Sequence, residues 1–230
     1  MTASALTFTL IPIAAVFLGS LIAVTRRPSE AIFSATQHLA AGVVFAAAAT
    51  EILPQVMHQG SPTATFVGGA LGVALMLSLK AAERRAKGPI AMLGAVAVDI
   101  LIDGLILGLA FLAGARAGLL LTIALTLEVL FLGLTVTAAL SETVRSKAKI
   151  VASTMGIALL LPLGALLATP IAQLSPAVVS GFLSFGLMAL LYLVTEELLV
   201  EAHEKPDSPL ISAMFFVGFL GLMLAEEMMG

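Results

Sequence analysis

Residues 89–114 read PIAMLGAVAVDILIDGLILGLAFLAG, and this stretch decides the fold. It is long enough to cross a bilayer, for which an α-helix needs about 20 mostly apolar residues. Its only charged residues are two acids near its middle, Asp99 and Asp103. An ionised side chain at the centre of a bilayer costs about 2.5 to 3.5 kcal/mol on insertion scales, so each acid kept there is a candidate functional residue. The stretch therefore predicts a transmembrane helix that carries a polar site.

Seven further apolar stretches of similar length lie between clusters of charged residues, Pro and Gly. Together, the eight spans are predicted at residues 5–25, 32–56, 62–83, 89–114, 117–140, 149–170, 176–201 and 209–228. The first span lacks the basic start and the small-residue cleavage pattern of a signal peptide, so we expect it to remain as a helix. Because the connections are short, we expect an all-α polytopic membrane protein whose single transmembrane transporter domain covers residues 1–230.

The composition of the whole chain agrees with a helical membrane bundle. Its 230 residues are 60% hydrophobic and 11% charged, with a mean hydropathy of +1.13, whereas a soluble domain has roughly 25% charged residues. The chain has no Cys, which excludes disulfides, thiolate zinc sites, iron–sulfur clusters and thiol catalysis. A net charge of −3 without a basic run gives no footprint for nucleic acid, so we expect no nucleic-acid partner.

The basic residues predict the orientation of the bundle, because Lys and Arg of short loops stay on the cytoplasmic side. Ten of the eleven follow the odd-numbered spans: Arg26, Arg27, Lys80, Arg84, Arg85, Lys87, Arg145, Lys147, Lys149 and Lys205. Only Arg116 lies in an alternate loop. We therefore expect a multi-pass protein of the plasma (inner) membrane, surrounded by the lipid bilayer, with its N- and C-termini extracytoplasmic.

Small residues and a proline give two further expectations about the helices. Small residues at four-residue spacing, Gly104 with Gly108 and Gly114 with Gly118, favour close helix packing, although a chain with 20 Gly also shows such pairs by chance. Pro162 interrupts the sixth span, where it either breaks the helix beside a cavity or only kinks it. The sequence leaves both alternatives open.

Three acids are predicted to meet near the middle of the membrane. Asp99 and Asp103 are four residues apart, which places them one turn apart on one face of the fourth span. Glu128 lies midway along the fifth span, at a similar depth on the neighbouring antiparallel helix. Since the sequence offers no Lys, Arg or His at that depth, the three carboxyl groups must be protonated or share a cation.

Two interpretations of these acids compete. In one, each acid is protonated and hydrogen-bonded to a Ser or Thr, for instance Thr122 or Thr126 near Glu128. In the other, which we favour because three acids at one depth need more than local hydrogen bonds, Asp99, Asp103 and Glu128 bind a divalent metal ion. Ligands that are all oxygen suit Mg²⁺, Mn²⁺ and Fe²⁺, while zinc usually recruits imidazole or thiolate. The metal ion is expected as a substrate, and no cofactor is expected.

Further polar residues extend this line toward both faces of the membrane. Glu51 and His58, near the outer end of the second span, are candidate entry residues. Candidate exit residues lie at the inner end of the seventh span: Glu196, Glu197, Glu201 and His203. An alternative for Glu201 and His203 is simple solvation beside the following loop. Near the outer end of the last span, Glu226 and Glu227 are interpreted as interfacial charges. The layout predicts a permeation route with an outer mouth, a central site and an inner exit.

Motifs on four spans carry a resemblance to a known family. They are EILP at 51–54, DILIDG at 99–104 followed by LILGLAF at 105–111, PLGALL at 162–167, and Tyr192 with EELLVEAH at 196–203. These motifs resemble the Zrt/Irt-like (ZIP) divalent-metal transporters, and the resemblance covers nearly the whole chain. It implies a bundle of eight helices with both termini outside, alternating access, and transport of divalent metal cations toward the cytoplasm.

The chain departs from the metal-binding motifs of that family. Where the family's fourth helix has His-Asn-x-Pro-Glu-Gly, this chain has Asp99, Ile100 and Asp103 in place of His, Asn and Glu. Leu132 replaces the second Glu of the fifth helix, and Leu161 replaces the acid before the proline of the sixth. The family's central site is often binuclear, so these departures leave a single carboxylate site. We expect Mn²⁺, Fe²⁺ or Zn²⁺ as the substrate, with Mg²⁺ also compatible, and a shift from zinc toward harder ions.

Other functions compete with transport. A membrane protein derived from a transporter that only senses metal, or acts as a scaffold, would tolerate the lost ligands. An intramembrane protease is less favoured, because the Glu-Glu-x-x-x-Arg motif of one class ends here in Glu201, and aspartyl enzymes need their two Asp on two helices. We therefore expect no enzymatic activity. The sequence is also compatible with assembly into a homodimer.

A short repeat relates the second and seventh spans. Thr50-Glu51-x-Leu53 matches Thr195-Glu196-x-Leu198, on helices that run in opposite directions. Transporter folds often contain inverted repeats, but a match of this length also arises by chance. The repeat is therefore a hypothesis that needs structural support.

Overall fold

The computed structural model describes residues 2–25, 29–59, 61–85, 89–204 and 208–229. Of the basic residues used to predict the orientation, Arg26, Arg27, Lys87 and Lys205 lie outside these ranges. Within them the chain forms helices joined by short turns, and no strand occurs. Eight helical segments of the described part are long and apolar enough to cross a membrane.

The eight segments agree with the predicted spans to within a few residues at each end. Their elements are α1 (Thr2–Thr25), α2 (Glu30–Ala47) with η1 (Ala48–Ile52) and α3 (Leu53–Gln59), α4 (Pro62–Arg85), α5 (Pro89–Ala113), α6 (Ala115–Leu140), α7 (Lys147–Ala158) with α8 (Leu160–Ile171), α9 (Pro176–Leu193) with η2 (Val194–Leu198) and α10 (Leu199–His203), and α11 (Pro209–Met229). The prediction of an all-α polytopic membrane protein is confirmed.

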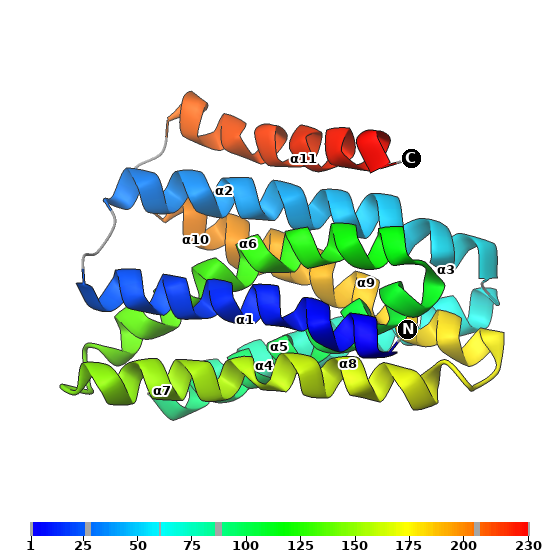
Figure 1. Ribbon diagram of the computed structural model, residues 1–230, viewed down its shortest axis with the longest axis horizontal. Coiled ribbons are helices and arrows are strands. Elements are labelled where there is room, and N and C mark those ends of the chain that lie inside the picture. The colour runs from blue at the N-terminus through cyan, green and yellow to red at the C-terminus, as the bar shows by residue number, and fades with distance from the viewer. Residues whose placement is uncertain (1, 26–28, 60, 86–88, 205–207, 230) are drawn as a thin grey trace.

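The helices run along the long axis of the molecule, and both ends of the chain lie at one end of it (Figure 1). An even number of crossings places both ends of the chain on the same side of a membrane. We call this end of the molecule the terminal end. The opposite end, which we call the basic end, carries the last turn of α4 and the first turn of α7, with their basic residues Lys80, Arg85, Lys147 and Lys149. The described Lys and Arg residues are therefore segregated along the axis, apart from Arg116 at the start of α6.

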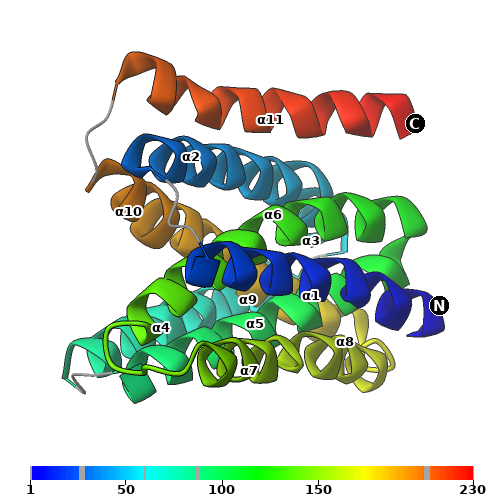
Figure 2. The ribbon, with the colours of Figure 1, turned by 60° about the vertical axis from the view of Figure 1, so that its left-hand side comes forward.

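The helices form two groups. The closest packing in the first group joins α1 to α6 and α5 to α8, and in the second it joins α2 to α11 and α4 to α9. Figures 1 and 2 both show α11 lying against α2 on the outside of the bundle. The two groups meet mainly where α2 packs against α6. Side chains on α5 and α6 that point toward α2 and η2 therefore lie at the boundary between the groups.

Glycine allows α5 and α8 to approach each other closely. A Cβ atom at Gly104 would overlap the carbonyl oxygen of Leu161, and one at Gly164 would overlap that of Leu101. The predicted close packing at Gly104 and Gly108 is therefore confirmed, since both face α8.

The second glycine pair behaves differently from the prediction. Gly114 has no neighbour within 4 Å of an added Cβ, so close packing there was wrong. Gly114 instead precedes the first residue of α6 in an extended conformation, where the chain turns from α5. Gly118 lies against the ring of Phe111 on α5. The spacing of small residues therefore predicted close helix packing correctly for one of the two glycine pairs.

Proline interrupts two spans in different ways. Pro162 has no N–H to bond the carbonyl of Ala158, and the sixth span is broken there, with Leu159 between α7 and α8. In the second span, Pro54 follows η1, a π-helical turn in which the N–H of Leu53 bonds the carbonyl of Ala48. The interruption is the single residue Leu159, whose backbone stays in the right-handed helical region, and the acidic cavity described below is not lined by this part of the span.

A second π-helical turn, η2, lies in the seventh span, where the N–H of Leu199 bonds the carbonyl of Val194. Both turns contain the residues of the short repeat, Thr50-Glu51 in η1 and Thr195-Glu196 in η2. Single π turns inside α-helices are rare and occur often at functional sites. The matching local geometry supports the inverted repeat and makes both turns candidate functional positions.

The contact between α5 and α8 generates the first prediction. Gly104→Ala should lower the free energy of unfolding by about 1 to 3 kcal/mol, because the new methyl group forces the helices apart. Gly94→Ala, on the same helix but in open space, should leave the stability unchanged or raise it by about 0.5 to 1 kcal/mol, as expected for Gly to Ala in a helix. Thermal unfolding in detergent, followed by far-UV circular dichroism, measures both. Equal melting temperatures for the two variants would contradict the close contact.

Candidate metal site

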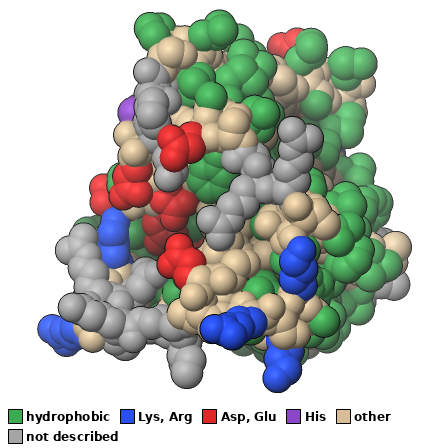
Figure 3. All heavy atoms as spheres, turned by 90° about the vertical axis from the view of Figure 1, so that its left-hand side faces the viewer, with side chains coloured by type: hydrophobic (Ala, Val, Ile, Leu, Met, Phe, Trp, Pro, Cys, Tyr) green, Lys and Arg blue, Asp and Glu red, His purple; other side chains and the backbone are tan. Residues whose placement is uncertain are grey.

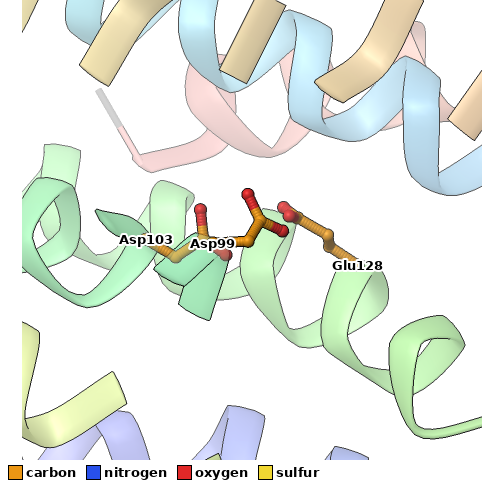
Figure 4. Close-up of side chains that lie close together, drawn as sticks. All are labelled: Asp99, Asp103 and Glu128. Atoms are coloured by element: carbon orange, nitrogen blue, oxygen red, sulfur yellow. The ribbon is translucent and has the colours of Figure 1, made fainter. Parts of the chain in front are cut away.

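The three predicted carboxylates lie together inside the bundle. Asp99 and Asp103 project from α5 and Glu128 from the adjacent α6, and their oxygen-bearing ends converge (Figure 4). One carboxylate oxygen from each lies within 4.8 Å of the others. Their exposed fractions are 9%, 2% and 2%. Among the described residues, this is the one group of three or more acids or histidines close enough to share a metal ion.

Hydrogen bonding does not account for these acids. Oδ2 of Asp103 and both carboxylate oxygens of Glu128 are buried, and the described residues offer them no donor except each other, since the Asp103 and Glu128 side chains lie within hydrogen-bonding reach and can share a proton. The hydroxyl of Thr122 donates to the carbonyl of Gly118, and that of Thr126 donates to the carbonyl of Thr122, both at 2.6 Å. The two Thr hydroxyls proposed as partners of Glu128 therefore donate to carbonyl groups of their own helix. A buried carboxylate without partners is costly, so the site needs protons or a cation.

The geometry suits a hard divalent cation. Oxygen ligands lie about 2.0 to 2.6 Å from Mg²⁺ or Ca²⁺, so two ligands on opposite sides of one ion are about 4 to 5 Å apart. The three carboxylate oxygens lie within 4.8 Å of one another, so a single ion can reach all of them. Three ionised carboxylates carry one more negative charge than a dication neutralises. The arrangement can therefore bind a divalent ion and still hold a proton.

A fourth acid lies near this cluster. Glu197, on η2 of the other helix group, is close enough for its charge to act on Asp99, Asp103 and Glu128. It was predicted as an exit residue at the inner end of the seventh span. The π turn belongs to the continuous segment from α9 to α10 and brings Glu197 to the boundary between the groups. The sequence alone does not show this, because depth along a helix does not reveal which side chains face each other.

An acidic cavity connects the cluster to the basic end. Its volume is about 340 Å³, and its lining residues come from α4, α5, α6, η2 and α10: Met76, Leu79, Lys80, Met92, Ala95, Val96, Asp99, Leu132, Thr135, Val136, Ala139, Glu196, Glu197 and Glu201. Figure 3, which looks onto the basic end, shows acidic side chains gathered in the middle of this face and basic ones around its lower part. Three of the four predicted exit residues thus line the cavity in which Asp99 lies.

One basic residue also lines this cavity. Nζ of Lys80 lies 3.2 Å from Oε2 of Glu196, donates to the Glu196 backbone carbonyl at 2.9 Å, and lies 5.4 Å from the centre of the Tyr192 ring. The sequence identified Lys80 only as a marker of orientation. Its pairing with Glu196 spans 116 positions of the chain, and no local signal in the sequence points to it.

At the terminal end an ion pair joins the two helix groups. Nη2 of Arg116, on α6, lies 2.9 Å from Oε1 of Glu226, on α11. Both charges act on Glu51, which is buried in η1. Glu226, which the sequence analysis interpreted as an interfacial charge, thus pairs with Arg116, the exception to the charge pattern. The candidate entry residue Glu51 lies beside this pair.

The two histidines predicted to border the route lie outside the carboxylate cluster. His58 is exposed near the end of α3, and its Nδ1 bonds the carbonyl of Pro54 at 2.7 Å. His203 ends α10, where its ring lies against that of His38. The sequence analysis did not single out His38, nor Gln37, whose Nε2 donates to Oε2 of Glu201 at 2.7 Å. The sequence analysis missed these two residues because the packing of α2 against α10 cannot be read from the sequence.

Comparisons of the chain with protein-family models and with curated proteins find no match. The interpretation of the site therefore rests on its own chemistry. Three features make up that chemistry: the carboxylates of Asp99, Asp103 and Glu128, their burial in two membrane-length helices, and the acidic cavity beside them.

The second prediction concerns metal binding by this cluster. Mn²⁺ should raise the melting temperature of the protein in detergent, by the equivalent of about 2.7 kcal/mol at 100 times the dissociation constant. Glu128→Gln should abolish this increase. Without metal it should be at least as stable as the unsubstituted protein, because it loses one of three crowded negative charges. Melting curves with and without Mn²⁺ measure both effects.

Glu142→Gln is the matched control, since Glu142 is exposed at the end of α6. It should keep the full increase in melting temperature. A metal-dependent increase that survives in Glu128→Gln would show that the ion binds elsewhere.

Proposed function

We propose that this chain transports divalent metal cations across the membrane toward the cytoplasm, with Asp99, Asp103 and Glu128 as the central binding site. One observation carries the proposal: three buried carboxylates meet near the middle of two membrane-length helices, and the other described residues offer no donor to Oδ2 of Asp103 or to either oxygen of Glu128. Ionisable groups at such a depth are costly and typically mark ion pathways. A site that only stabilised the fold would not need three acids at one place.

The acidic cavity supports a route from the central site to the basic end. Asp99 forms part of its wall, and Glu196, Glu197 and Glu201 line the remainder toward that end. Basic residues of short loops stay in the cytoplasm, so we assign the basic end to the cytoplasmic side. The cavity then connects the site to the cytoplasm, and the described conformation corresponds to an inward-open state.

The terminal end supports the opposite half of the cycle. There the Arg116–Glu226 pair joins the two helix groups, and Glu51 lies buried beside it. Entry from outside would require the groups to separate at this end, which exposes Glu51 as the first acid to meet an incoming ion. Exposed ion pairs contribute about 0 to 1 kcal/mol, so such a contact can open and close without a large barrier.

The charge of the site supports a role for protons. Three ionised carboxylates exceed the charge of a dication by one, and Glu197 adds a further acid nearby. A proton bound or released with each ion would balance the site. The membrane potential also favours inward movement, by about 2 × 2.3 kcal/mol per 100 mV for a dication.

The ligand chemistry supports Mn²⁺ and Fe²⁺ as substrates ahead of Zn²⁺, with Mg²⁺ compatible, because the central ligands are oxygens alone. The resemblance of residues 99–111 and 196–203 to the ZIP transporters agrees with this function.

Transport into liposomes tests the proposal. Purified protein should carry Mn²⁺ into vesicles, and Asp99→Asn, Asp103→Asn or Glu128→Gln should each reduce the initial rate at least tenfold, because each removes a ligand of the ion. A manganese-quenched dye inside the vesicles reports the rate, and a pH-sensitive dye reports accompanying proton movement. Glu227→Gln, a neutralised exposed acid on α11, should transport normally. Metal binding without any flux would support the metal sensor instead.

The absence of native Cys allows a direct test of the route and of its side. Thr135→Cys, in the cavity wall, should react with a membrane-impermeant thiol reagent from the cytoplasmic side, and Mn²⁺ should slow the reaction. Glu227→Cys, at the terminal end, should react only from the outer side and without an effect of Mn²⁺. Vesicles of the two orientations distinguish the sides, and the reversed pattern would overturn the assigned direction of transport.

A further inference from the structure

A second hollow lies at the basic end, where the ends of three helices meet. Its volume is about 380 Å³, and its walls come from the last turn of α1, the residues that follow α6, and the first turn of α7. Pockets that hold small ligands measure about 300 to 1,000 Å³. It shares no lining residue with the acidic cavity. We call it the basic pocket, and its lining includes Val24, Thr25, Val144, Arg145, Lys147 and Ile150.

The basic pocket carries positive charge that the described acids do not neutralise. Arg145 and Lys147 line it, and none of its lining residues is an acid. Neither side chain forms an ion pair with a described residue, whereas the basic residues of the acidic cavity and of the Arg116–Glu226 contact both do. Glu142, an acid nearby in the sequence, is exposed and also forms no such pair. Because two cations that line one hollow repel each other, an anion bound there would stabilise both.

Another part of the wall is apolar. Val24, Val144 and Ile150 line the pocket, and they belong to an apolar cluster that joins α1, α6 and α7. The pocket therefore combines a positive wall with an apolar one. A ligand that suits it needs an anionic group and an apolar part.

The pocket lies at the depth where a membrane-spanning helix reaches the headgroups. Thr25 is the last residue of the first span, and Lys147 is the first residue of the sixth. One turn before Thr25, the apolar side chains of Leu21 and Ile22 are 43% and 42% exposed. On a transmembrane helix such side chains face lipid chains. One lipid can therefore place its headgroup at the pocket and its tails along this face of α1.

We propose that the basic pocket binds the phosphate group of an anionic phospholipid, with Arg145 and Lys147 as its charged ligands. Anionic lipids of the cytoplasmic leaflet attract basic residues near the membrane surface, and basic pockets between transmembrane helices on that side bind their headgroups. The basic end is the end assigned to the cytoplasm. A soluble phosphate would satisfy the two charges but would leave the apolar wall and the exposed face of α1 without a partner, which favours the lipid. The site does not depend on metal transport.

Lipid binding by the full chain, purified in detergent, tests the pocket. The protein is titrated with phosphatidylglycerol or with phosphatidylcholine, and native mass spectrometry counts the lipids bound to each chain. The first phosphatidylglycerol should bind at least tenfold more tightly than phosphatidylcholine, because only the former carries a net negative charge. Equal affinities for the two lipids would overturn the proposal. Inorganic phosphate at the same concentration should not displace the lipid, and displacement would show that the pocket takes a soluble anion instead.

Two double variants separate the pocket from the general charge of the basic end. Arg145→Gln with Lys147→Gln should weaken the binding of phosphatidylglycerol at least tenfold and leave that of phosphatidylcholine unchanged. Both side chains are exposed, so this variant should fold. Arg85→Gln with Lys149→Gln is the matched control, because it removes the same charge from exposed residues of the basic end that do not line the pocket. It should weaken binding by less than threefold. Equal losses in the two variants would overturn the proposal.

Discussion

The structure depends on one electrostatic constraint: three carboxylates are buried at the same depth between α5 and α6, and the described residues offer their free oxygens no donor. The bilayer around the bundle offers no donor to such a cluster, and of the three acids only Asp99 lines the cavity that leads to the basic end. The arrangement is therefore stable only with a partner from outside the chain, a proton or a cation. In the proposed transport cycle, the acidic cavity and the nearby Glu197 would supply or remove that partner.

Helix packing gives this cluster its position. The reciprocal contact of Gly104 and Gly164 brings α5 against α8 on one side, which leaves the opposite face of α5, with Asp99, free to line the cavity. Interruptions of the regular helices also position acidic side chains. The π turn η2 places Glu197 at the boundary between the two helix groups. The related turn η1 holds Glu51 at the terminal end. Two polar features thus lie where the groups meet: Glu197 near the carboxylates, and the Arg116–Glu226 ion pair.

Much of the fold, and part of the site, follows from local sequence. The eight spans were predictable because the number of apolar residues needed to cross a bilayer is fixed by its thickness. Asp99 and Asp103 share a face because four residues make about one turn of helix. Gly114 shows the limit of such patterns, since its spacing predicted a helix contact that it does not make. A small residue permits a close approach, but the partner helix decides whether one occurs.

The sequence by itself determined the number of spans, the segregation of the basic residues and the acids that belong to the membrane interior. Only the tertiary structure decided which distant side chains meet: Lys80 with Glu196, Arg116 with Glu226, and His38 with His203. The reason is physical. Hydrophobicity and helical periodicity act over one or two turns and are written in consecutive residues. Contacts between helices depend on the rotation and register of each one in the bundle, which the packing of all the spans settles together.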